Sequence, residues 1–232
     1  MEGWPTTIEE LISEQKRIAM LSVSNWEKPS KPFVCAAVFI CYGRQRSGPG
    51  KKFDQGWGAA IALFPDGQLK TFTISERASF DYIPGLLALR DGPLLEKAVV
   101  GLNLRPELLF VNATSRDHPH RAGLALHLGY KLDIPTVGIT RKPLIATGVL
   151  PGKNRGDRSE LRIGNETVAF WLRTQENKAP LVVHPGYRLD WETAIEIVLS
   201  YTIKYRTPEP LRLARKAARL CRAGLVRSAL CS

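Results

Sequence analysis

The chain alternates short runs of apolar residues with polar segments that are rich in glycine, proline and charged side chains. Continuous apolar runs of this kind are typical of strands that are buried on both faces. The strands predicted from these runs lie at residues 33–42, 57–64, 69–75, 108–112, 136–140, 166–173 and 181–184. The segment PDGQ at 65–68 favours a hairpin turn between the second strand and the third.

Other segments carry apolar residues at helical spacing. In the first of them, Ile8, Leu11 and Ile18 fall near one face. Thr6 or Thr7 can cap its start, and acidic residues follow in the first turn. The helices predicted in this way lie at residues 7–22, 84–100, 119–132, 191–205 and 211–225. A linker, a basic Gly-rich loop and a polar excursion are expected at residues 25–32, 43–56 and 151–165.

The order of these elements predicts the fold class. Three strands with hairpin-type connections, followed by helix, strand, helix and strand, are the order of the ribonuclease H-like fold. In this α/β fold a central mixed β-sheet, with three antiparallel strands and then parallel strands, is flanked by helices. No linker separates two cores, so residues 1–232 are expected to form a single domain.

Composition and charge narrow the range of partners. The chain has 232 residues, of which 44% are hydrophobic, and its formal net charge is +11. Such a basic balance favours an anionic partner, nucleic acid first and an anionic membrane surface second. There is no run of ~20 apolar residues, so no membrane span is expected.

The cysteines and the N-terminus favour a cytoplasmic location. The four cysteines form no C-x-x-C pair, and Cys35 and Cys41 lie in an apolar run, which predicts free thiols in a reducing compartment. The opening MEGWPTTIEELISEQK is acidic and polar, which argues against a signal peptide.

The segment LLFVNATSRDHPHRAGLALHLG, residues 108–129, has the pattern of a candidate site. Its apolar strand stops at Asn112, and the loop that follows holds Asp117, His118 and Arg121. Folds of the α/β class place their sites at the carboxyl ends of strands. The residue at this strand tip is an amide, where a metal-dependent enzyme would need a carboxylate.

Five blocks in the chain together resemble the endonuclease V family, whose members nick nucleic acid near deaminated bases such as inosine. The blocks are FDYIPGLLALRDGPLLEKA at 80–98, the segment at 108–129, IPTVGITRKPL at 134–144, HPGYRLDWETAIEIV at 184–198 and RTPEPLRLA at 206–214. The resemblance covers about residues 8–215 and leaves a basic C-terminal helix and tail at 216–232. It implies a hydrolase of nucleic-acid repair that uses Mg²⁺ or Mn²⁺.

The resemblance implies three metal-binding carboxylates, and the chain departs from the family pattern at each of them. The positions are Phe39, Asp91 in place of a glutamate, and Asn112. A phenyl ring cannot bind a metal, and a neutral amide is a poor Mg²⁺ ligand. We therefore expect cleavage to be lost or strongly reduced, with Mg²⁺ or Mn²⁺ bound weakly or not at all.

Other family positions concern the phosphate. His118 matches a family histidine near the scissile phosphate, and Arg141 replaces a family lysine, so that Asp91, His118 and Arg141 are the candidate catalytic residues. Tyr187 stands where the family has a histidine.

A relocated metal site is an alternative. Asp117 could join Asp91 and His118 in a one-metal site. Otherwise Asp117 is a solvated loop carboxylate that pairs with Arg116 or Arg121. Asp54, in the basic loop, is expected to be solvated.

The resemblance also implies a wedge, a rigid loop that enters the space left by an extruded base. Its residues here are Tyr82, Ile83, Pro84 and Gly85. An aromatic ring and a proline can offset part of the cost of extrusion by stacking. The alternative for Tyr82 is a core tyrosine with its hydroxyl at the surface. Further candidate nucleic-acid contacts are Arg90, Arg121, Lys142 and Gly186.

The C-terminal helix has a basic face of Arg212, Arg215, Lys216, Arg219 and Arg222. This face could be solvated, could track phosphates or could lie on a membrane surface.

Three functions remain open. The first is a nucleic-acid-binding pseudoenzyme for DNA or RNA, including inosine-containing strands; the others are an active endonuclease with a rearranged metal site and a non-catalytic interaction protein. No small-molecule cofactor is expected.

Overall fold

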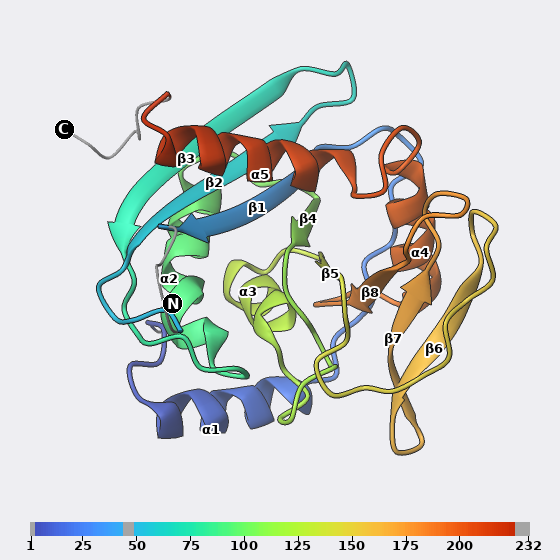
Figure 1. The fold of residues 1–232 in the computed structure, drawn as a ribbon, viewed down its shortest axis with the longest axis horizontal. Coiled ribbons are helices and arrows are strands. Elements are labelled where there is room, and N and C mark those ends of the chain that lie inside the picture. The colour runs from blue at the N-terminus through green and yellow to red at the C-terminus, as the bar shows by residue number, and fades with distance from the viewer. Residues whose placement is uncertain (1–2, 44–48, 226–232) are drawn as a thin grey trace.

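The computed structural model describes residues 3–43 and 49–225. Over these residues the chain forms an eight-stranded sheet in the order β3-β2-β1-β4-β5-β8-β7-β6 (Figure 1). The strands are β1 (Cys35–Tyr42), β2 (Gln55–Leu63), β3 (Leu69–Arg77), β4 (Leu108–Val111), β5 (Thr136–Thr140), β6 (Arg158–Ile163), β7 (Glu166–Leu172) and β8 (Leu181–Pro185). The helices are α1 (Ile8–Ala19), α2 (Leu87–Val100), α3 (Leu124–Leu132), α4 (Trp191–Ser200) and α5 (Glu209–Arg222).

The strand directions confirm the predicted mixed sheet. β1, β2 and β3 are antiparallel neighbours, and β4 and β5 extend the sheet from β1 in parallel. β8 then pairs with β5 in the antiparallel sense, and β7 and β6 follow it. The parallel part is therefore β1, β4 and β5, as a ribonuclease H-like fold requires.

Two helical layers bury the two faces of the sheet. Ala36 and Val38 of β1 pack with residues of α2 and α3 on one face. Ala37 and Phe39 pack on the other face, in a cluster with residues of α4 and α5. Successive side chains of a strand point to opposite faces, so β1 contributes to both layers. Figure 1 shows α5 lying across β1 and β2.

The largest differences from the predicted elements are one missed strand and two helix ends. The polar excursion contains β6, whose sequence RSELRI is polar because the strand lies at the sheet edge with only Leu161 fully buried. α3 begins at Leu124, five residues later than predicted at 119, because Arg121 has φ +56° and Gly123 is the N-cap. α4 ends at Ser200 rather than at 205. Within the described residues, no helix has both the length and the apolar character needed to cross a membrane.

Candidate functional site

Phe39 of β1 lies beside Asn112, the residue that directly follows β4. Each lies one residue beyond the paired residues Val38 and Val111 of the parallel strands β1 and β4. A guanidinium from α5 contacts both of them: Arg215 Cζ lies 5.2 Å from the centroid of the Phe39 ring, and Arg215 Nη2 donates to Asn112 Oδ1 at 3.1 Å. Two of the three positions at which the resemblance implies carboxylates therefore share an arginine.

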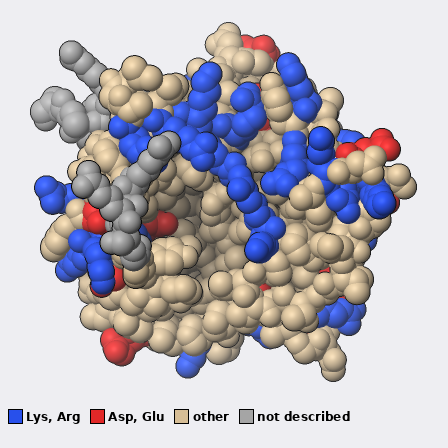
Figure 2. Space-filling view, in the orientation of Figure 1, with Lys and Arg blue, Asp and Glu red and all other residues tan. Residues whose placement is uncertain are grey.

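Arg215 belongs to a group of positive charges. Burial lowers the pKa of its guanidinium, and the neighbouring charges of Arg141, Arg219 and Arg206 lower this pKa further. Burial and the charge of Arg141 lower the pKa of Arg206 in the same way. Figure 2 shows Lys and Arg side chains gathered in the upper part of this face, beside a hollow near its middle. This region attracts anions.

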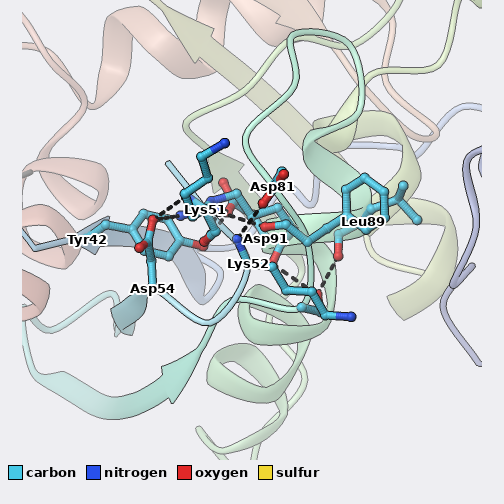
Figure 3. Close-up of polar contacts among 10 residues, drawn as sticks. Tyr42, Lys51, Lys52, Asp54, Asp81, Leu89 and Asp91 are labelled. Carbon is cyan, nitrogen blue, oxygen red and sulfur yellow. Dashed lines mark hydrogen bonds and ion pairs between the residues drawn. The ribbon is translucent and has the colours of Figure 1, made fainter. Parts of the chain in front are cut away.

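Asp91 has different surroundings (Figure 3). It lies on α2, where the Tyr42 hydroxyl donates to its Oδ1 at 2.5 Å, and Arg90 Nε is 3.9 Å from the same oxygen. Burial raises the pKa of Asp91 to about 6, against the opposing effects of the Tyr42 hydrogen bond and the Arg90 charge. The contacts of Asp91 are thus with Tyr42 and Arg90, while Phe39 and Asn112 share Arg215.

These side chains do not fit a divalent cation. In the part of the chain that the structure describes, no group of three or more His, Cys, Asp or Glu residues is placed to hold a metal. The amide oxygen of Asn112 already accepts a hydrogen bond from a cation, which would repel a metal ion. The relocated site of Asp91, Asp117 and His118 is not formed either.

Asp117 is a buried structural carboxylate. It is 0% exposed, and it accepts hydrogen bonds from the backbone N–H groups of Leu144, Ile145 and Ala146 at 2.7, 2.9 and 2.8 Å. The interpretation of Asp117 as a solvated partner of Arg116 or Arg121 is therefore wrong. These hydrogen bonds fasten the segment after β5 to the loop after β4.

The same loop is fastened to the wedge by His118. Its Nδ1 accepts from the backbone N–H of His120 at 3.1 Å, which leaves Nε2–H to donate to the Gly85 carbonyl at 2.8 Å. Burial lowers the pKa of His118, which favours the neutral imidazole that this pattern needs. With both ring nitrogens engaged inside the chain, His118 supports the wedge instead of presenting a free N–H to a phosphate.

The wedge itself is accessible. The side chains of Tyr82 and Ile83 are 45% and 36% exposed, so Tyr82 is not a core tyrosine. Gly85 has φ +83°, a conformation that favours glycine. Behind the wedge is a cavity of about 140 Å³, lined by Tyr82, Gly85, Asn112, His118 and Leu144 among others. This volume is below the ~300 Å³ of typical small-molecule pockets and suits a single ring system.

Arg90 holds the wedge in place. Its side chain is 2% exposed and donates to Asp54 Oδ2 at 2.9 Å, to the Lys51 carbonyl at 2.8 Å and to the Phe80 carbonyl at 2.7 Å. Around it, the Lys52 N–H donates to Asp81, as Figure 3 shows. Arg90 is therefore a buried strut and not a phosphate contact, and the expectation that Asp54 is solvated is wrong.

The remaining candidates divide into exposed and packed residues. Arg141 and Lys142 are exposed directly after β5. Arg121 pairs with Glu166 at 2.9 Å. Tyr187 is 9% exposed and its hydroxyl donates to Asp133 at 3.3 Å, on the side of α3. A Cβ on Gly186 would lie 2.5 Å from the Thr136 carbonyl oxygen, so this glycine is explained by close packing of the backbone.

The sequence model of the family described as Endonuclease V matches residues 50–216. The chain belongs to the endonuclease V family. An Endonuclease V from Nostoc punctiforme is 31% identical over 218 residues, which cover 93% of this chain and 95% of the relative. An Endonuclease V from Dictyoglomus thermophilum is 41% identical over 138 residues, a match that spans 60% of each chain.

Solved structures of the endonuclease V family have the same fold. The Streptomyces avermitilis Endonuclease V superimposes with a TM-score of 0.82 at 31% identity and covers 97% of each chain. A Ciona intestinalis Endonuclease V, in complex with a 24mer DNA that contains an inosine followed by a ribo-adenosine, gives a TM-score of 0.76 at 19% identity over 94% of this chain and 99% of that one. At that identity the likeness shows the fold alone.

Sequence reasoning missed the place of Arg215 in this site. It grouped Arg215 with the basic face of the C-terminal helix. The residue directly follows Ala214 and precedes Ala218 by three positions, and both alanines are buried against the sheet. The long side chain of an arginine beside the buried face of a helix can extend to the sheet on which that helix packs. The spacing of Arg215 from the two apolar alanines therefore already indicated this contact.

Proposed function

We propose that this endonuclease V homologue binds inosine-containing nucleic acid and has lost, or strongly reduced, metal-dependent cleavage. The observation that carries the proposal is the Arg215 guanidinium on Phe39 and Asn112, where the resemblance implies carboxylates. The Ciona relative binds inosine-containing DNA, and the present chain has an exposed wedge residue, Tyr82, beside a cavity.

Binding uses the wedge, the cavity and the basic face. Extrusion of a base costs a few kcal/mol, and stacking of the exposed Tyr82 ring in the space left behind offsets part of that cost. The cavity behind the wedge takes the extruded base. The positive charges of Arg141, Arg206 and Arg215 attract the phosphates on either side.

This site lacks the set of carboxylates that metal-dependent cleavage requires. Two-metal hydrolysis needs carboxylates that neutralise the ions, and here one carboxylate, Asp91, is held by Tyr42 and Arg90. We infer a non-catalytic role of this protein in nucleic-acid repair. Cys35 and Cys41 are free thiols, which supports a reducing cytoplasmic location, and Cys231 lies outside the described residues.

The direct test combines binding with nicking. Single and double strands of DNA and RNA, with and without one inosine, are incubated with the protein in Mg²⁺, in Mn²⁺ and in EDTA. We expect binding that is tighter for inosine-containing strands, with no cut product. Robust nicking that disappears in Asp91→Ala would overturn the loss of cleavage, and absence of binding at low salt would favour an interaction protein.

Stacking by the wedge is tested with paired variants. Tyr82→Ala removes the ring, and we expect the preference for inosine-containing duplex to fall about tenfold, since one base–aromatic stack contributes roughly 1–3 kcal/mol. Tyr82→Phe keeps the ring and should keep the preference. Fluorescence anisotropy measures both variants, and an equal loss in the two would exclude stacking as the cause.

A further inference from the structure

Where the resemblance implies metal ions, the structure has an arginine. We propose that Arg215 takes the place of the metal, and that its guanidinium, flanked by Arg141 and Arg206, binds a phosphodiester of the strand without a divalent cation. This inference rests on the proposed function, because it names how the same site holds the strand.

The geometry fixes Arg215 in position and leaves it able to bind. One N–H of the guanidinium donates to Asn112 Oδ1 at 3.1 Å, and the Phe39 ring lies against the group at 5.2 Å without taking a hydrogen bond. A guanidinium carries five N–H donors. Within the described residues Asn112 is its one hydrogen-bond acceptor, so further donors remain for a ligand.

The charges around Arg215 are not balanced by carboxylates. Several arginines elsewhere on the surface form ion pairs, among them Arg105 with Asp133, Arg121 with Glu166, Arg162 with Glu160 and Arg212 with Glu209. Among the described residues, no such pair is formed by Arg141, Arg206, Arg215 or Arg219. The charges of the other three lower the pKa of Arg215. Like charges held together without a counter-ion favour a bound anion.

The position selects a phosphate next to the extruded base. Asn112 both accepts from Arg215 and lines the 140 Å³ cavity, so it separates the guanidinium from the base site by one side chain. The planar fork of arginine matches two phosphate oxygens at once. A base in the cavity would thus bring its own backbone phosphate to Arg215.

The test compares neighbouring variants on one helix. Arg215→Gln is measured against Lys216→Gln, which removes the same charge at an exposed position one residue away. Binding of an inosine-containing single strand is followed by anisotropy in EDTA and in Mg²⁺. We expect wild-type affinity to be the same in both, a loss of about tenfold in Arg215→Gln and a loss within about twofold in Lys216→Gln.

A second variant guards against misfolding of the first. Asn112→Asp keeps the shape of the side chain and neutralises Arg215 by an ion pair, and it should weaken binding to a similar extent while the circular dichroism spectrum stays that of the wild type. If the strand binds only with Mg²⁺, or if Arg215→Gln and Lys216→Gln lose equally, the metal replacement is overturned although the proposed function stands.

Two further measurements complete the test. One distinguishes a phosphate of a strand from that of a free nucleotide, and the other tests the proposed function by itself. If Arg215→Gln weakens the binding of inosine 5′-monophosphate but leaves strand binding unchanged, the site takes a free nucleotide and the strand contact is overturned. If the wild type binds no strand at all, the proposed function fails, whatever the variants do.

Discussion

At the scale of single residues, the fold shifts the pKa of Asp91 into a pH range in which unfolding can be measured. Burial raises its pKa from 3.8 to about 6, which means that the folded protein binds this proton more tightly than the unfolded chain does. The stability from this group is complete below pH 3.8 and is lost as the pH rises through about 6.

Asp91→Asn removes that titration. We expect the free energy of unfolding of the variant, relative to wild type, to rise between pH 4 and pH 7 by up to about 3 kcal/mol, at 1.36 kcal/mol per pKa unit. Urea unfolding at several pH values measures the difference. Curves of wild type and variant that stay parallel over this range would contradict a raised pKa.

Asp117 makes a prediction of the opposite sign. Its carboxylate accepts three backbone N–H groups in a fully buried position, and an amide can accept fewer of them. Asp117→Asn should lower the free energy of unfolding by about 3 kcal/mol. Asp66→Asn is the matched control, because Asp66 is exposed and accepts one N–H, from Gln68. Equal effects of the two changes would show that the burial of Asp117 has no energetic weight.

The residues explain what sequence reasoning could reach in the site. The local motif at Tyr82 and Gly85 indicated an exposed ring and a glycine turn, and the structure has both, while the role of this segment as a wedge stays a prediction. The partners of Asp117 at 144–146 and the contact between Arg215 and Asn112 join segments far apart in the chain. Such contacts depend on how α5 and the loops pack on the sheet, which no local pattern contains.

At the scale of elements, the predictions succeeded for strands with clear apolar runs, the edge strand β3 included, and failed for the polar edge strand β6. β1 and β5 are apolar because both faces are covered, and their bounds were found to within two residues. β6 was not predicted, because an edge strand with one fully buried side chain has the polar sequence that is typical of a loop. The start of α3 escaped because the chain turns through a left-handed residue at Arg121 before the helix begins.

We propose that the shape of the wedge controls selectivity for inosine-containing strands. Gly85 has φ +83°, and a Cβ there would meet His118 Nε2 at 3.6 Å, an ordinary contact, so the strain of Gly85→Ala comes from the backbone. We expect a loss of about 1–2 kcal/mol in stability and a reduced preference for inosine-containing strands. Gly67→Ala, at φ +86° in the β2–β3 hairpin, is the control, with a similar loss of stability and an unchanged preference.

At the scale of the whole molecule, the formal net charge of +11 makes binding depend on salt. If the four arginines around the site each neutralise one phosphate of a single strand, the slope of log K against log salt is about −3. Titrations between low and physiological salt measure this slope. A slope near zero would mean that the strand does not lie on this face.

Asp117 and His118 are neighbours in the chain, yet they fasten two different segments of the cavity lining: Asp117 holds residues 144–146 and His118 holds Gly85. Both fastenings are hydrogen bonds within the chain itself. We therefore expect the capture of a base to need no opening or closing of the cavity walls, so that the observed association rate rises linearly with protein concentration in a single phase. If a variant loses the hydrogen bonds of Asp117 or His118, the cavity has to form before the base can bind. A slow phase whose rate does not depend on concentration would reveal that step.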